Sequence, residues 1–150
     1  MSPTQSLTQR VADVNSLTPE TVDLIVLPEM ALSGYMFSTP TSILPYLEPT
    51  TAGPTTKLAQ SLAKRLKCHV VAGYPEALAS APQPRSSSSS GDGEGSLGEA
   101  GPKEMKALEG EGTGVGYNSA VIVGPSGEVV GNYRKSFRFE TDKNWAREGM

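Results

Sequence analysis

A glutamate stands directly after a short apolar run near the beginning of the sequence. Residues 23–27 are Asp-Leu-Ile-Val-Leu, and Pro28 separates them from Glu29. Such a run is typical of a strand buried on both faces of a sheet, and Pro28 ends the strand because it cannot donate to a sheet ladder. We expect Glu29 at the carboxyl edge of the sheet, where α/β folds collect catalytic groups. Desolvation by its apolar neighbours Met30 and Leu32 would raise the pKa of Glu29 and favour a role as general base near neutral pH, unless a nearby cation holds the carboxylate ionised. The alternative is that Glu29 is a solvated residue at the end of the strand.

A lysine follows a second regular pattern near the end of the sequence. Residues 119–123 form an apolar run, Gly-Pro-Ser-Gly occupies 124–127, and residues 128–133 form a second run. Two such runs around a Gly-Pro turn predict a β-hairpin. The hairpin would deliver Arg134 and Lys135 to the end of its second strand.

Between these two patterns the sequence predicts a helix followed by a strand. Leu58, Leu62 and Leu66 recur every four residues within residues 55–67, which is the pattern of an amphipathic helix. Residues 68–73 then read as a strand, which Pro75 and Glu76 would close as Pro28 and Glu29 close the first strand. On this interpretation Glu76 lies at the same sheet edge as Glu29.

Two shorter expectations concern the amino-terminal third of the chain. Residues 1–22 predict a short amphipathic helix that ends before Pro19. Three prolines in residues 38–50 exclude a long regular element there.

The sequence has one cysteine, Cys68, and one histidine, His69. Adjacent residues of a strand point to opposite faces of the sheet, so this pair is not suited to act as nucleophile and base. We expect Cys68 to be a core residue and His69 a residue of the strand edge. One Cys and one His do not furnish the usual three or four metal ligands, so we expect no metal site.

Four ordered sequence blocks resemble the nitrilase, or carbon–nitrogen hydrolase, superfamily. They are Leu-Pro-Glu-Met-Ala-Leu-Ser-Gly-Tyr at 27–35, Leu-Glu-Pro-Thr-Thr-Ala-Gly at 47–53, Cys-His-Val-Val-Ala-Gly-Tyr-Pro-Glu at 68–76 and Tyr-Arg-Lys-Ser-Phe at 133–137. Within that superfamily the blocks are most similar to the protein N-terminal amidases. That branch deamidates Asn or Gln at a protein's amino terminus, as part of the N-degron pathway.

The resemblance implies roles for particular residues. Superfamily members use a Glu, a Lys and a Cys; Glu29 stands where the general base stands, and Lys135 stands where the lysine that stabilises the tetrahedral intermediate stands. A second acid often follows the lysine. Glu140 is the better match for it and Asp142 the alternative. The resemblance implies neither a metal nor an organic cofactor.

The nucleophilic Cys of the superfamily is expected some tens of residues after the lysine, and the sequence ends at Met150 without one. We therefore expect an incomplete α/β domain, the first half of a nitrilase-like α-β-β-α sandwich. The expected function is hydrolysis of N-terminal Asn or Gln amides on proteins or peptides. The alternatives are a noncatalytic fragment, or a hydrolase of small amides or nitriles from the same superfamily.

Residues 79–116 are poor in groups that could be buried and include five consecutive serines. We interpret them as a disordered insert within a single partial domain over residues 1–150.

Composition restricts the partners and the location. The net charge of −3 gives no basic field for nucleic acid, and the single cysteine suits a reducing compartment. No apolar run approaches the roughly 20 residues of a membrane span, and no secretory signal is recognisable. We expect the cytoplasm, with the nucleus as the alternative. By resemblance, a homodimer is one option for the full-length form.

Overall fold

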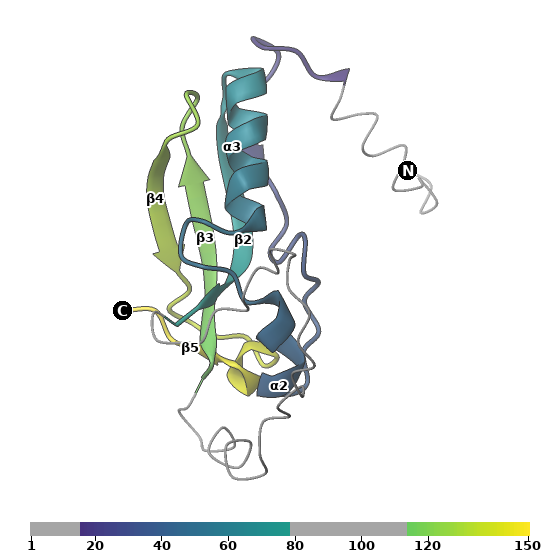
Figure 1. Cartoon of the computed structure of the whole chain (residues 1–150), viewed down its shortest axis with the longest axis vertical. Coiled ribbons are helices and arrows are strands. Elements are labelled where there is room, and N and C mark those ends of the chain that lie inside the picture. Colours follow the sequence, from purple (N-terminus) through teal and green to yellow (C-terminus); the bar gives the residue numbers. More distant parts are fainter. Residues whose placement is uncertain (1–15, 79–113) are drawn as a thin grey trace, which may run out of the picture.

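The computed structural model describes residues 16–78 and 114–150, which form a five-stranded mixed sheet with one long helix against it (Figure 1). Strands β1 (Leu24–Val26), β2 (His69–Ala77), β3 (Gly116–Val123) and β4 (Val129–Arg134) lie side by side in that order. The short strand β5 (Ala146–Arg147) pairs with β3. β1 runs parallel to β2, whereas the β2–β3 and β3–β4 pairs are antiparallel.

The expected strand over residues 23–27 is present as β1, one residue shorter at each end. The expected burial on both faces is not found in the described part of the chain, where Leu24 and Val26 are exposed. The Leu27 N–H still donates to the Val71 carbonyl at 2.9 Å, so the pairing with β2 reaches the residue before Pro28. Glu29 therefore follows the carboxyl end of a parallel strand, as predicted.

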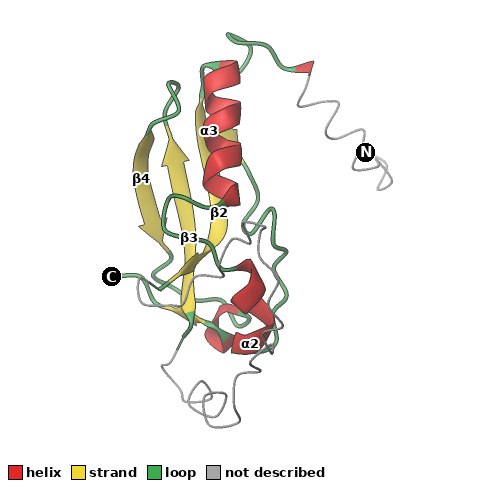
Figure 2. Cartoon of the chain, viewed as in Figure 1, coloured by secondary structure: helices red, strands yellow, loops and turns green. Residues whose placement is uncertain are grey.

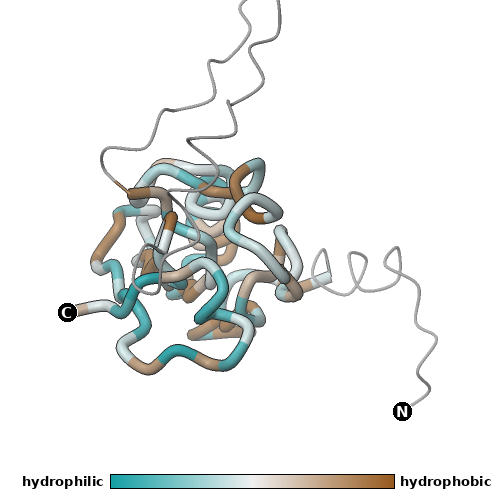
Figure 3. Tube along the Cα trace, turned by 90° about the horizontal axis from the view of Figure 1, so that it is seen from below, coloured by the Kyte–Doolittle hydropathy of each residue, from teal (hydrophilic) through white to brown (hydrophobic). Residues whose placement is uncertain are grey.

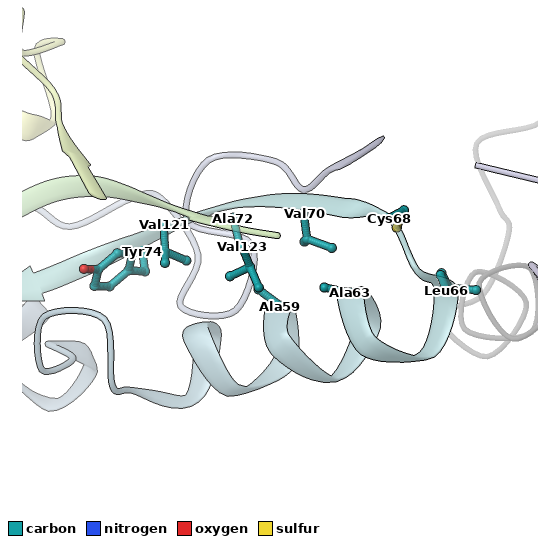
Figure 4. Packing of buried hydrophobic residues seen from close by; sticks show 9 residues of the cluster. All are labelled: Ala59, Ala63, Leu66, Cys68, Val70, Ala72, Tyr74, Val121 and Val123. Carbon is teal, nitrogen blue, oxygen red and sulfur yellow. The ribbon is translucent and has the colours of Figure 1, made fainter. Parts of the chain in front are cut away.

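Helix α3 (Pro54–Leu66) confirms the predicted amphipathic helix and packs along β2 and β3. Figure 4 shows its small residues Ala59 and Ala63 facing Val70, Val121 and Val123. Pro54 occupies the first turn, where no N–H is needed, and basic residues occupy the last turn. The helix covers one face of the sheet.

The strand after α3 is longer than the sequence predicted. β2 continues through Pro75 to Ala77, so the prediction that Pro75 closes it is wrong. Pro75 has no N–H to donate, but its carbonyl accepts the Glu48 N–H at 2.7 Å, and the Ala77 N–H donates to the Glu48 carbonyl at 2.8 Å. Backbone hydrogen bonds with Glu48 thus allow β2 to continue beyond Pro75.

The predicted hairpin is confirmed as β3 and β4, with an irregularity in register at Ile122 and Val123. β3 begins at Gly116, the last residue of the range expected for the insert, and Val115 before it is buried. Most of the expected insert, and most of the expected helix within residues 1–22, lie outside the described residues.

Residues 38–50 contain only short elements, as expected: the helix α2 (Pro40–Ile43) and the 3-10 helix η1 (Leu44–Tyr46). A further 3-10 helix, η2 (Asp142–Asn144), lies near α2 at the same end of the sheet (Figure 2). A second apolar cluster joins these loops around Met30, Ile43 and Trp145, which are each at most 2% exposed.

The sheet face opposite α3 is open in the described part of the chain. Ile25 packs toward the α3 side, so its neighbours Leu24 and Val26 point to the other face, and they are 52% and 64% exposed. Along the tube in Figure 3, short hydrophobic stretches alternate with hydrophilic ones, as expected of elements with a buried and a polar side. One helical layer and one sheet with an apolar open face make half of an α-β-β-α sandwich, which agrees with the predicted partial fold. No helix in the described residues has the length and apolarity needed to span a membrane.

Candidate functional site

Glu29 lies immediately after β1 with its backbone pressed against Gly73 of β2. A Cβ on Gly73 would lie 3.0 Å from the Glu29 Cα and 3.1 Å from the Met30 nitrogen. Glycine therefore allows a close approach that no other residue would permit without displacing the chain. The expected position of Glu29 at the sheet edge is found, with its side chain 44% exposed.

The Lys135 ammonium is shared between two carboxylates. Its Nζ lies 2.8 Å from Glu29 Oε1 and 2.8 Å from Asp142 Oδ2. Burial lowers the pKa of Lys135, but the hydrogen bonds to Asp142 and Glu29 outweigh this effect, so the pKa lies above its usual value. Glu29 therefore has a nearby cation, Lys135, which stays charged at neutral pH and can hold the carboxylate ionised.

The second acid beside the lysine is Asp142, the alternative to the expected Glu140. The Glu140 side chain is 77% exposed and pairs with Lys143 at 2.7 Å. Asp142 is 1% exposed, and its Oδ2 also accepts the Phe139 N–H at 2.9 Å. Residues 139–145 turn tightly around η2, and this turn directs Asp142 inward and Glu140 outward.

Asn118 is a member of the site that was not predicted from the sequence. Its Nδ2 donates to Glu29 Oε1 at 2.5 Å and to Asp142 Oδ1 at 3.1 Å, so Asn118 and Lys135 bridge the same two carboxylates. Its position in the sequence could have indicated this role, because Asn118 lies near the start of the first hairpin strand and Lys135 follows the end of the second. The Lys135 N–H donates to the Asn118 carbonyl at 2.8 Å, which makes the two residues neighbours across the strands.

A hollow opens beside this cluster on the sheet face opposite α3. Its apolar lining comes from Leu27, Val71, Gly73 and Ala120. Glu29, Asn118, Lys135 and Tyr133 line it as well. The arrangement offers charged hydrogen-bonding groups beside an apolar surface, which suits a small polar group carried on a larger molecule.

Cys68 is remote from this cluster, as expected of a core residue. Figure 4 shows it near Leu66 at the carboxyl end of α3, with Tyr74 near the other end of the helix. Glu29 packs on Gly73, the residue before Tyr74. Cys68 is 1% exposed, burial raises the pKa of its thiol, and His69 is exposed. Within residues 16–78 and 114–150, no group of His, Cys, Asp and Glu is arranged to hold a metal ion.

The sequence pattern of the family described as carbon-nitrogen hydrolase matches residues 4–149. The chain belongs to the carbon-nitrogen hydrolase family. The match covers nearly the whole sequence, including β1 and β4, which Glu29 and Lys135 follow.

Two curated relatives are each named protein N-terminal amidase. The relative from Saccharomyces cerevisiae (strain ATCC 204508 / S288c) is 33% identical over 123 residues, which are 82% of this chain and 20% of the relative. The relative from Schizosaccharomyces pombe (strain 972 / ATCC 24843) is 31% identical over 143 residues, which are 94% of this chain and 40% of the relative. The chain therefore spans less than half the length of these relatives.

Several solved structures that match this chain are also described as N-terminal amidases. The crystal structure of an N-terminal amidase matches 95% of this chain with a TM-score of 0.63 at 31% identity, and the chain covers 26% of that structure. Structures described as N-terminal amidase with an Asn-Glu peptide and with a Gln-Gly peptide match with TM-scores of 0.64 and 0.63. A CN-hydrolase superfamily protein from Xanthomonas campestris, 16% identical with a TM-score of 0.58, shares the fold.

Proposed function

We propose that this chain is the amino-terminal part of an amidohydrolase that deamidates Asn or Gln at the amino terminus of proteins or peptides. The observation that carries the proposal is the Lys135 ammonium held 2.8 Å from both Glu29 and Asp142. The similarity to N-terminal amidases, including structures with Asn- and Gln-initiated peptides, supports the substrate class. Asn118 and the apolar hollow beside it support a binding site for a carboxamide group.

In the proposed reaction Glu29 moves protons and Lys135 stabilises negative charge. A cysteine from the part of the protein that this chain does not cover would lose its proton to Glu29 and add to the carboxamide carbon. Lys135 would donate to the oxyanion of the tetrahedral intermediate. Collapse would break the C–N bond and release ammonia, which takes the proton from Glu29. Water would then lose a proton to Glu29 and form a C–O bond with the thioester carbon. The C–S bond would break to release the acid, and Glu29 would return the proton to the cysteine thiolate.

Asp142 has a supporting role in this scheme. Since it is buried and also held by the Phe139 N–H and by Asn118, it keeps the ammonium in place while Glu29 changes its protonation state. Without Asp142, protonation of Glu29 would remove the ammonium's remaining carboxylate partner within the site. We accordingly assign Glu29 and Lys135 as catalytic and Asp142, in place of Glu140, as the acid that orients the lysine.

The first experiment is to sequence the source transcript past the codon for Met150. A frame that meets a short apolar strand and a Cys within about the length of one βαβ unit allows the complete protein to be expressed. Ammonia release is then measured from Asn- and Gln-initiated peptides, with the same peptides acetylated at the amino terminus as controls. Turnover of a small amide or nitrile with no release from either peptide would overturn the proposed substrate class.

A second candidate, a noncatalytic fragment, is favoured by the place of Cys68. The only cysteine of the sequence is buried near Leu66 at the carboxyl end of α3, whereas Glu29 packs on Gly73, farther along β2. If a stop codon follows Met150 at once, we expect the purified chain to release no ammonia from any of these substrates. Turnover by that chain would refute the fragment hypothesis.

A further inference from the structure

Glu76 is a fully buried carboxylate that takes no part in the reaction described above. In the part of the chain that the structure describes, four side chains donate hydrogen bonds to it. Arg134 donates to it twice, from Nε at 3.0 Å and from Nη2 at 2.5 Å. Ser119 Oγ and Thr50 Oγ1 donate at 2.6 Å each, and Asn132 Nδ2 donates at 3.1 Å. Glu76 was expected at the same sheet edge as Glu29, but within the described residues the two carboxylates have no hydrogen-bond partner in common.

Two of the residues that hold Glu76 are direct neighbours of site residues. Ser119 follows Asn118, and Arg134 precedes Lys135. Ser119 and Arg134 are themselves register partners across β3 and β4. Because successive strand residues point to opposite faces, Glu76 is bound on one side of these strand ends and Glu29 on the other.

We propose that Glu76 is a positioning residue: by holding Arg134 and Ser119 on the α3 side of the sheet, it fixes the strand ends that present Lys135 and Asn118 to Glu29. Its importance for catalysis rests on the proposed function. The positioning itself is a property of the described chain and is testable on it.

The ion pair between Arg134 and Glu76 has the directional chemistry that a positioning role requires. A guanidinium that binds a carboxylate through two N–H groups is restricted in direction as well as in distance. The Arg134 guanidinium also lies 4.3 Å from the centre of the Tyr117 ring, so a second contact on β3 limits its movement. Lysine cannot reproduce this geometry, since it offers a single point charge on a flexible stem.

The test compares how fast an acylating reagent modifies Lys135 in the 150-residue chain and in the variants E76Q and R134K. Modification of each lysine is followed by peptide mass spectrometry, with the exposed Lys57 of α3 as internal standard. E48Q is the matched control. Glu48 is also buried and accepts two hydrogen bonds from Thr55, at 2.6 and 2.9 Å, but Thr55 is not adjacent to any site residue.

The expected result is faster modification of Lys135 in E76Q and R134K, by about tenfold for each unit that the lysine's pKa falls as its pairing loosens. Lys57 should react at the same rate in all proteins, and Lys135 in E48Q should react as in the parent chain. Parent-like rates in E76Q and R134K would overturn the proposal, and so would an equal acceleration in E48Q. If circular dichroism shows that E76Q does not fold, R134K decides alone, because it keeps the positive charge beside Glu76.

A second readout separates this inference from the proposed function. In a complete, active protein E76Q should lower kcat with little change in KM, because substrate binding groups remain while the ammonium is misplaced. If no protein containing this chain deamidates a peptide but Lys135 labelling responds as expected, the proposed function fails and the positioning stands. Unchanged kcat despite faster labelling would overturn the catalytic importance of Glu76.

Discussion

The Lys135 Nζ lies 2.8 Å from Glu29 Oε1, although the two residues are 106 positions apart in the sequence. The antiparallel pairing of β2, β3 and β4 folds the end of the hairpin back to the carboxyl end of β1, and this explains the contact. Asp142 completes the arrangement from a third segment. The ammonium thus has two anionic partners, of which Glu29 is half-exposed and Asp142 is buried.

Replacing Asp142 should damage the site far more than replacing Glu140. In a complete protein we expect D142N to lower kcat on the order of a hundredfold, comparable to losing a donor that stabilises a transition state. E140Q should change kcat less than about twofold, because it removes only an exposed ion pair with Lys143. Steady-state kinetics on an Asn-initiated peptide measure both. A larger effect from E140Q than from D142N would restore Glu140 as the second acid.

Gly73→Ala should displace the backbone of Glu29. The new Cβ would lie 3.0 Å from the Glu29 Cα, a backbone atom that cannot move by rotating a side chain. We expect a loss of about 1–3 kcal/mol in the free energy of unfolding and faster acylation of Lys135. Gly131→Ala is the matched control, since within the described residues its Cβ would meet side-chain atoms of Ile122 and no backbone atom; the nearest, Cδ1, lies at 3.3 Å and can move by rotation of the side chain. The two variants can be compared by urea unfolding; equal stability and equal labelling would refute the close-approach argument.

Cys68 should be unreactive while the chain is folded. Its thiol is buried beneath α3, and burial raises its pKa, so little thiolate is present at neutral pH. We expect Ellman's reagent to modify it only at the rate of unfolding, and rapidly in denaturant, which serves as the control. Fast modification of the native chain, with one thiol titrated before unfolding, would contradict its assignment as a core residue.

The extent to which the sequence predicted the molecule differs between its fold and its site. Local sequence was enough to predict α3 and the hairpin. The helix follows from the four-residue spacing of Leu58, Leu62 and Leu66, and the hairpin from the Gly-Pro turn between its strands, so neither prediction needs a tertiary contact. The predicted end of β2 was wrong because backbone pairing with Glu48, a tertiary contact, extends the strand beyond Pro75. Glu140 and Asp142 could not be separated by spacing, since the direction of each depends on the turn at η2.

The stability of the chain should depend on pH through Glu76. Burial opposes its ionisation, but hydrogen bonds from Arg134, Ser119, Thr50 and Asn132 prevail and lower the pKa of Glu76 from 4.5 to about 2. Because the folded pKa is the lower one, the stabilisation is present above pH 4.5 and is lost as the pH falls from there toward 2. The difference between a pKa of 4.5 and one of about 2 corresponds to roughly 3 kcal/mol of stability.

Urea unfolding of the parent chain and of E76Q between pH 7 and pH 2 measures this contribution. We expect the parent to exceed E76Q in stability near neutral pH and the difference to shrink steadily below pH 4.5, because the protonated carboxyl then resembles the amide. E140Q removes an exposed carboxylate, so the difference in unfolding free energy between E140Q and the parent should change little between pH 7 and pH 2. A gap between parent and E76Q that stays constant down to pH 2 would mean that Glu76 is not ionised in the folded chain.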